Sequence, residues 1–506
     1  MRKRIAALFT LVLLTGLAAG CGASGNNEAA GQKDDASTAT TAYVAYDGST
    51  KTEAEEEVKE ETVFNIYSIG EDFKNRVQDF YPDYEVTGDD SGQIGDVKVQ
   101  WHVYSDVQEY RDELDEKLSL QADPETGAAL DGAATDEKID MFVVDEAYLR
   151  DYVESGYSLP VMGDPGLQPE ELADQFLYTQ QMATDAGGAL KAVSWQATPG
   201  VFAYRRSIAK EVLGTDDPEK VQEAVSDWES FAGTAEAVKE YGYYMLSSYG
   251  DAFQVYADNV TSAWVEDGAL NIDPHLEEWA VQTREFAENG YTHGTEQWND
   301  EWRADHTGDG EVFGFFYSSW GIHYTLESKA TGESDSEEED GSSDVESAKG
   351  DYAVCRGPEP SHYGGQWIIA AAGSDHADLA GSIMRELTCN PEIMKKITKD
   401  IREFTNTVSG MTELAQSEYK ADVLGGQNPI PVYVESAKLL SKMHTTTYDD
   451  DLNLGFQVTM QDYFTGTVSE IDAMETFRKV ALSRYEELED RAGDEEDTEE
   501  DAEEEE

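Results

Sequence analysis

Short apolar strands alternate with amphipathic helices along the chain, and this order constrains the fold more than any other feature of the sequence. We expect strands at 63–68, 97–104 and 139–144, with a helix over 73–81 between the first two and another opened by Asp106. The run 139–144 is nearly continuous in apolar residues, as in strands that a parallel sheet buries on both faces. The pattern predicts an α/β architecture, in which ligands gather at the carboxyl ends of strands.

The length of 506 residues exceeds what one hydrophobic core usually serves, so the sequence predicts two lobes. Two further predicted strands, 190–194 and 200–204, flank Trp195 to Pro199, which we interpret as a crossing between the lobes. A later strand, 312–317, ends at Ser318-Ser319-Trp320-Gly321. From Met411 to about Leu488 the pattern is mostly helical.

The first residues have the pattern of an export signal. Basic residues at the start precede an apolar run, Ile5 to Leu17, which is too short to span a membrane. The sequence Leu17-Ala18-Ala19-Gly20-Cys21 then resembles a bacterial lipoprotein signal, in which cleavage before Cys21 leaves a thiol that carries the lipid. We therefore expect residues 1–20 to be a signal peptide and Cys21 to bear the acylated anchor; an ordinary export signal with a chance cysteine is the alternative.

Three segments are too polar to offset the entropy of ordering them. Residues 21–61 are expected to form a disordered tether, and residues 489–506 a disordered acidic tail. The block 327–351 is also rich in Glu, Asp, Ser and Gly and is predicted to be a long acidic surface loop.

The charge balance excludes one class of partner. The chain has 106 acidic against 36 basic residues, a formal charge of -70, which repels nucleic acid and anionic lipid headgroups. Besides Cys21, Cys355 and Cys389 match no zinc or redox spacing; they are predicted to be free thiols, although a disulfide is left open. No metal or cofactor site is expected, and His362 is taken as an ordinary, partly exposed histidine.

No catalytic signature is present, so aromatic and polar residues at strand ends are the best indicators of function in this sequence. Trp195, Trp320 and Trp367 each lie at a strand-loop junction beside a small residue, where an indole can be offered to the apolar face of a sugar. Core packing is the competing interpretation for each of them, because most tryptophans are largely buried. Trp298 and Trp302 lie in a polar stretch and fit either role.

The order of elements resembles the extracellular solute-binding proteins of ABC transporters, in the carbohydrate-binding branch related to maltose-binding protein. The resemblance covers roughly residues 62–488 and lies in the lipoprotein signal, Phe64 to Asp72, Asp140 to Asp145, Ala203 to Arg206, Trp228-Glu229, Phe316 to Gly321, and Gly357-Pro358 with Gly364-Gly365. It implies a type II periplasmic-binding-protein-like fold, with lobe 1 at 62–200 plus 363–405 and lobe 2 at 201–362 plus 406–488. It also implies a ligand site drawn from both lobes: Glu71, Asp72, Asp145, Glu146, Trp195, Gln196, Tyr249, Asp251, Trp320 and Trp367.

The resulting expectation is a lipid-anchored, monomeric receptor on the outer face of the cell membrane. It would capture a carbohydrate, most simply an oligosaccharide, by lobe closure and deliver it to the permease subunits of an importer, without catalysis. The alternatives are a receptor for a polyamine or another cation, a surface glycosidase that uses two of the carboxylates, and an adhesin or sensor that has lost transport.

Overall fold

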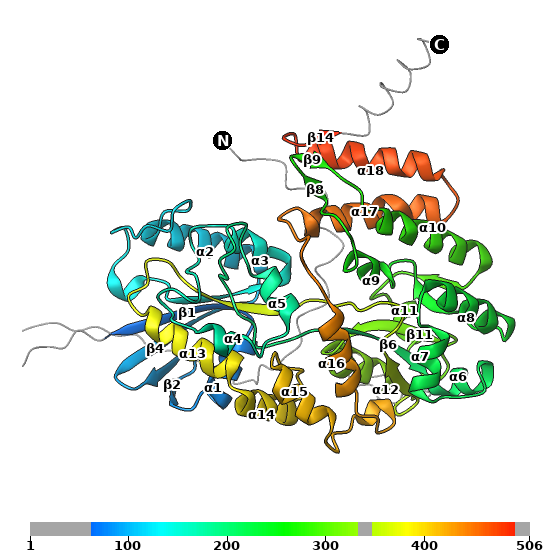
Figure 1. The fold of residues 1–506 in the computed structure, drawn as a ribbon, viewed down its shortest axis with the longest axis horizontal. Helices are drawn as coiled ribbons and strands as arrows, with labels where there is room; N and C mark the ends of the chain where they lie inside the picture. The colour runs from blue at the N-terminus through cyan, green and yellow to red at the C-terminus, as the bar shows by residue number, and fades with distance from the viewer. Residues whose placement is uncertain (1–61, 332–346, 491–506) are drawn as a thin grey trace, which may run out of the picture. The chain divides into compact units, whose positions relative to one another are not determined.

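A computed structural model describes residues 62–331 and 347–490 (Figure 1). The expected signal peptide, Cys21 and the tether to residue 61 lie outside the described residues, as do the middle of the acidic block and the tail beyond residue 490. Among the described residues, no helix has the length and apolar character that crossing a bilayer requires.

The first lobe is built on a six-stranded sheet with the order β13-β5-β1-β4-β3-β2. β1 is parallel to both β4 and β5, whereas β13 runs antiparallel to β5, and β2 and β3 form an antiparallel hairpin beside β4. The strands are β1 (Val63–Ile69), β2 (Tyr84–Gly88), β3 (Ser91–Ile94), β4 (Val97–Tyr104), β5 (Met141–Asp145) and β13 (Gln366–Ala370). The first four residues of β5 are buried, as its continuous apolar run predicts.

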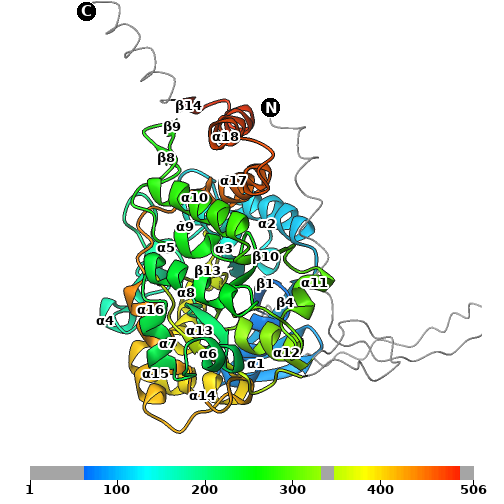
Figure 2. The same ribbon diagram turned by 90° about the vertical axis from the view of Figure 1, so that its right-hand side faces the viewer.

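Helices cover both faces of this sheet. In Figures 1 and 2, α2 (Val107–Gln121) and α3 (Glu146–Val153) lie above the sheet, and α1 (Asp72–Phe80), α13 (Ala377–Cys389) and α14 (Pro391–Ile401) lie below it. The predicted start of α2 is confirmed, because the Asp106 side chain accepts a hydrogen bond from the Glu109 amide at 2.8 Å. Short helices α4 (Pro169–Leu172) and α5 (Leu177–Met182) lead towards the second lobe.

The second lobe contains two smaller sheets that meet at one bridge. One has the order β11-β6-β12, with β6 (Gly200–Arg205) antiparallel to both β11 (Gly314–Ser318) and β12 (Tyr352–Cys355). The other pairs β7 (Leu246–Ser248) with β10 (Thr292–Thr295) in parallel. A parallel bridge between Tyr244 and Val312 joins the approaches to β7 and β11, so β10, β7 and β11 all end at the same edge.

Helices complete the second lobe and the C-terminal part of the chain. They are α6 (Arg206–Val212), α7 (Pro218–Ala224), α8 (Trp228–Glu240), α9 (Phe253–Ala257), α10 (Pro274–Asn289), α11 (Asp300–Ala304), a π-helix (Ile322–Leu326), α12 (Glu327–Thr331), α15 (Val408–Ala415), α16 (Ile430–Leu439), α17 (Asp449–Phe464) and α18 (Glu470–Arg484). A small sheet of β8 (Val265–Glu266), β9 (Ala269–Leu270) and β14 (Glu489–Asp490) lies beside α18 (Figure 2). The predicted helical character after Met411 is confirmed.

The chain passes between the lobes three times, and the first two crossing segments contact each other. The first crossing segment, residues 194–199, leads into β6, and the second, residues 356–365, returns from β12 to β13. They are bonded to each other: Pro199 bridges His362, the Tyr363 amide donates to the Thr198 carbonyl at 3.2 Å, and the Thr198 hydroxyl donates to the Gly364 carbonyl at 2.7 Å. This pairing makes the crossing segments one connected unit.

Three expectations about local structure are wrong. Residues 190–194 do not form a strand; only Val193 makes an isolated bridge to β13, because the segment turns away into the first crossing. The acidic block does not begin as a loop, since its first residues form α12, where Ala330 is buried and its carbonyl accepts a hydrogen bond from the Ala348 amide at 2.8 Å. Likewise, the first two residues of the expected tail pair with β9 as β14.

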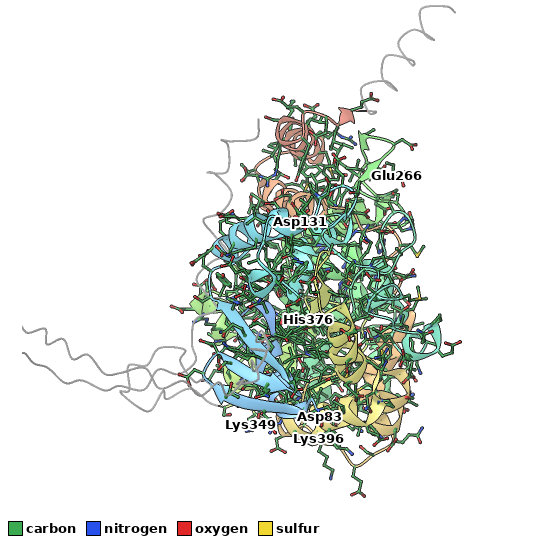
Figure 3. The ribbon with its side chains drawn as sticks, turned by 90° about the vertical axis from the view of Figure 1, so that its left-hand side faces the viewer. Asp83, Asp131, Glu266, Lys349, His376 and Lys396 are labelled. Carbon is green, nitrogen blue, oxygen red and sulfur yellow. The ribbon has the colours of Figure 1, made fainter. Side chains whose placement is uncertain are left out.

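Acidic side chains are spread over the surface of the described residues. Figure 3 labels three exposed ones, Asp83, Asp131 and Glu266, which come from well-separated parts of the chain. A carboxylate on the outside of this protein is therefore weak evidence of a site unless it makes specific contacts.

Candidate functional site

Carboxylates from two neighbouring strands of the first lobe meet at one edge of its sheet. Glu71 and Asp72 follow β1 after a turn at Gly70, whose φ of +67° is a backbone conformation that favours glycine. Asp145 ends β5, which is parallel to β1, and is half-buried. Burial raises the pKa of Asp145, hydrogen bonds from Gln366 and Tyr148 lower it, and the negative charge of Asp72 raises it.

Gln366 at the start of β13 and Gln196 of the first crossing segment connect this acidic edge to a buried ion pair. The Gln366 side chain donates to Oδ1 of Asp145 at 2.8 Å, and the Gln366 amide donates to Oε1 of Gln196 at 3.1 Å. The Gln196 side chain donates in turn to Oε1 of Glu403, whose other oxygen lies 2.7 Å from Nε of Arg76. We call these residues, Asp145, Gln366, Gln196, Glu403 and Arg76, the floor network.

Two of the three predicted stacking tryptophans are packing residues in this structure. Trp195 is 0% exposed and lies against Phe73, with ring centroids 5.2 Å apart. Its indole donates to Oε1 of Glu403 at 3.3 Å, which places it beneath the floor network. Trp367 is 1% exposed, and its indole donates to the Thr179 carbonyl at 3.2 Å. The small neighbours that suggested open platforms instead allow close packing around both rings.

The third tryptophan, Trp320, is accessible at the end of β11. Its indole donates to the Tyr363 carbonyl at 3.0 Å, and the two rings have centroids 6.2 Å apart. Tyr363 is 50% exposed and belongs to the second crossing segment, so the pair forms an aromatic surface at the junction of the lobes. Burial raises the pKa of the Tyr363 phenol, and the charges of Glu146 and Asp450 raise it further, so carboxylates from both lobes lie near this ring.

A tyrosine of lobe 2 lies near the floor network. Tyr324, in the π-helix after Trp320, is 59% exposed. Burial of its phenol group raises the pKa of Tyr324, the charge of Glu403 raises it further, and the guanidinium of Arg76 lowers it. Tyr324 of lobe 2 is therefore close enough to Arg76 and Glu403 of lobe 1 for their charges to affect it.

Glu146 is already held by protein groups. Oε1 of Glu146 lies 2.7 Å from Nε2 of His362, and Nδ1 of the same imidazole lies 3.0 Å from Oδ2 of Asp258. Nζ of Lys442 lies 2.9 Å from the other oxygen of Asp258. His362 is 0% exposed, so the expectation of an ordinary, partly exposed histidine is wrong: the side chain is enclosed where the second crossing segment passes between α3 and α9.

Asp251 is also committed to protein contacts. It is buried and accepts hydrogen bonds from the Ser247 and Ser248 amides, from the Ser248 hydroxyl and from the Gln297 side chain. These bonds fix the turn that follows β7. Tyr249, in the same turn, is half-buried with its ring near Phe464. Asp251 therefore positions this turn and has no spare acceptor of the kind a ligand contact would use.

Sequence reasoning missed several residues that the structure places at the junction: Glu403, Gln366, Tyr324, Tyr363, His362 and Lys442. Gln366 and Tyr363 flank the glycine pair at 364–365, which was a usable signal. Glu403 is one acid among 106 in the chain and has no distinguishing neighbour in sequence. Only tertiary contacts distinguish it.

The site is suited to holding a polar molecule. It offers carboxylate acceptors, amide groups and exposed aromatic faces, a combination that matches hydroxyl groups and apolar ring faces. Among the described residues, no group of three or more His, Cys, Asp or Glu side chains is arranged to hold a metal ion. A hollow of about 490 Å³ lies to one side, between α1 and the β2–β3 hairpin, and shares with the predicted site only Glu71.

Comparisons with known proteins agree on one family and one fold. A family model for bacterial extracellular solute-binding proteins matches residues 107–424, more than half of the chain. The structure is similar to an extracellular solute-binding protein of family 1, with 15% identity, a TM-score of 0.66, and coverage of 83% of this chain and 99% of that one. A search of curated proteins finds no match.

Two structures with named ligands have the same fold. The sugar-binding protein MalE from Xanthomonas citri is 12% identical, with a TM-score of 0.61 and coverage of 84% of this chain and 98% of that one. The galacto-N-biose-/lacto-N-biose I-binding protein of the ABC transporter from Bifidobacterium longum is also 12% identical, with a TM-score of 0.57 and the same coverage. At such identities the likeness concerns the two-lobed α/β fold alone.

Proposed function

Because this chain belongs to the bacterial extracellular solute-binding proteins, we propose that it is the substrate-binding component of an ABC importer, which captures a carbohydrate between its lobes and delivers it to the permease. Residues 62–200 with 363–405 would move as one lobe and 201–362 with 406–488 as the other. A ligand that touches both lobes favours the closed form, because only that form makes both sets of contacts.

The observation that carries the carbohydrate assignment is the placement of Trp320 and Tyr363 beside the floor network. Two accessible rings from one side and hydrogen-bonding amides and carboxylates from the other supply the two kinds of contact that a sugar needs. Two structures of this fold support the same ligand class. One is named a sugar-binding protein, and the other is in complex with β-1,6-galactobiose.

Titration calorimetry tests the assignment with the purified chain lacking residues 1–21 and a panel of β-1,6-galactobiose, lacto-N-biose, maltose and their monosaccharides. We expect binding of at least one sugar, and Trp320→Ala to weaken it about tenfold or more, as for a central aromatic contact. Tyr241→Ala is the matched control, because Tyr241 is 51% exposed at the far end of α8. Silence across the panel would overturn the carbohydrate assignment.

One rival has a specific observation in its favour. Burial raises the pKa of Asp450 to about 6, and the charges of Asp451 and Glu146 contribute, so negative charge is in excess at this side of the junction. A cationic ligand such as a polyamine would relieve that repulsion. Binding of spermidine that weakens steeply with salt, together with no response to sugars, would favour this rival.

The proposal also includes the anchor and the absence of catalysis. We propose that Cys21 carries the lipid, which holds the protein on the outer face of the cell membrane as a monomer. Labelling with a palmitate analogue in cells should be lost in Cys21→Ala.

Release of a product from any bound glycan, abolished by Asp145→Asn, would instead support a glycosidase.

A further inference from the structure

An exposed tryptophan is held in a strained backbone in the loop after β10. Trp298 follows β10, is 43% exposed and has a φ of +71°. A bulky residue in this left-handed region is strained, and such residues persist only where the surrounding structure enforces them. A glycine would adopt this backbone conformation without strain. The indole therefore serves a purpose other than the stability of its own loop.

The residues on both sides of Trp298 enforce this conformation. On one side, the Gln297 side chain donates to Oδ1 of Asp251 at 3.1 Å, and Asp251 is itself fixed in the turn after β7. On the other side, the Asn299 side chain accepts from the Trp302 amide at 2.8 Å and begins α11. Because both neighbouring residues are held by hydrogen bonds, the backbone at position 298 is held in a single conformation. The Cα atom that carries the indole is therefore fixed in place.

The ring rests on a column of aromatic side chains. Trp298 contacts Trp302 with centroids 4.8 Å apart, Trp302 contacts His306 at 4.3 Å, and His306 stacks on Phe315 of β11 at 3.7 Å. Trp302 is 3% exposed, and its indole nitrogen has no hydrogen-bond partner among the described residues. An unpaired buried donor is a second unfavourable feature in the same loop, so stability alone does not account for this arrangement.

The loops that carry Trp298 and Trp320 leave the same edge of the sheet. β10 is parallel to β7, and the bridge from Tyr244 to Val312 makes β7 parallel to β11, so the loops after β10 and β11 leave the same edge. Two strand spacings separate β10 from β11, which is about 10 Å. A single sugar ring on Trp320 would not reach that far, whereas a chain of two or more rings would.

We propose that Trp298 is a second stacking platform, which binds a further ring of an oligosaccharide whose first ring lies on Trp320 and Tyr363. This inference rests on the proposed function, because it takes the ligand to be a carbohydrate. Under this proposal, Trp298 makes the protein bind oligosaccharides more tightly than monosaccharides, because only the longer ligand reaches the second ring.

The test compares one sugar pair, the disaccharide that binds the native protein in the panel above and its own monosaccharide. Trp298→Ala should weaken binding of the disaccharide about tenfold or more and leave binding of the monosaccharide unchanged. Trp320→Ala should weaken both, Trp298→Phe should restore part of the disaccharide affinity, and Tyr241→Ala should change neither.

A second variant separates binding from folding. Trp298→Gly removes the ring and also the strained backbone, so the relief of strain should offset part of the packing lost against Trp302, and this variant should unfold at or above the temperature of Trp298→Ala while losing disaccharide affinity. If the native protein binds sugars and Trp298→Ala binds the disaccharide normally, or loses both sugars equally, the second platform is overturned. If the native protein binds no sugar, the proposed function itself fails, which is a distinct result.

Discussion

Nε2 of His362 lies 2.7 Å from Oε1 of Glu146, and this contact joins the second crossing segment to the start of α3. The imidazole also contacts Asp258 of lobe 2, so one buried side chain connects carboxylates from both sides of the junction. The relative position of the lobes therefore depends on whether the imidazole of His362 is charged. The first of four predictions follows from this.

The stability of the protein should depend on the charge of His362. Burial lowers the pKa of this imidazole, but the charges of Asp258 and Glu146 outweigh burial and raise it from 6.5 to about 9. Because the folded pKa lies above the unfolded one, the stabilisation is complete below pH 6.5 and is lost as the pH rises through about 9. His362→Gln should lower the free energy of unfolding by about 3 kcal/mol at pH 6, with a much smaller difference at pH 10.

Urea denaturation at pH 6, 8 and 10 measures this difference, and subtraction of the two curves removes the titration of other groups. His444→Gln, at an exposed histidine, serves as the control and should show no such trend. A gap between His362→Gln and the native protein that stays constant across this range would contradict the prediction.

Trp195 and Trp367 should contribute to stability and not to ligand affinity. Both rings are buried, so Trp195→Ala and Trp367→Ala should each lower the free energy of unfolding by about 3–5 kcal/mol. The phenylalanine variants keep most of the packing volume and should be milder. Urea denaturation and titration calorimetry give the two quantities; a Trp195→Phe variant with native stability and lost affinity would show that the indole contacts the ligand.

Glu403 should be essential to the floor network. Its side chain and that of Arg76 are 5% and 7% exposed, so Glu403→Gln leaves a buried guanidinium without its carboxylate, at a cost of about 3–5 kcal/mol. Glu418→Gln, at an exposed acid, should be silent. Replacing both partners, as Arg76→Met with Glu403→Leu, should destabilise the protein less than Glu403→Gln alone. Thermal melts of the native protein, the two single variants and the double variant measure this, and a different order of melting temperatures would show that the ion pair is dispensable.

The two cysteines in the described residues should behave as free thiols of unequal access. Neither is in a disulfide; Cys355 is buried and Cys389 is half-buried. Burial raises the pKa of the Cys355 thiol to about 12, so few thiolate ions exist at pH 8. In a Cys21→Ala chain, iodoacetamide at pH 8 should modify Cys389 slowly and Cys355 only after unfolding in urea, as mass spectrometry of peptides would show. Rapid modification of Cys355 in the native protein would contradict its burial.

Local pattern was sufficient for the framework of the site. The strands later seen as β1, β4 and β5 follow from their apolar runs, and the placement of Asp72 beside Asp145 follows from the parallel order of β1 and β5. The short hairpin of β2 and β3 was missed, because β2 is mostly exposed and lacks an apolar face. Such a strand is defined by its pairing with a neighbour and not by its own residues.

The identity of the contacting side chains could not be predicted in the same way. Trp195 and Trp320 have similar neighbours in sequence, yet one is enclosed by Phe73 and Glu403 and the other remains accessible. Glu403 lies more than 300 residues from Arg76, as its pairing records. No local signal distinguishes such a pair, because burial depends on which distant surfaces the fold brings together.

By itself, the sequence determined the alternation of strands and helices, the helix start at Asp106 and the edge at which carboxylates collect, since periodicity and capping act over a few residues. Only the tertiary structure decided which rings stay accessible, which acids are neutralised by His362, Lys442 or Arg76, and how the backbone at Trp298 is held. These outcomes depend on desolvation and on contacts between residues far apart in the chain, and both arise only when the two lobes are assembled.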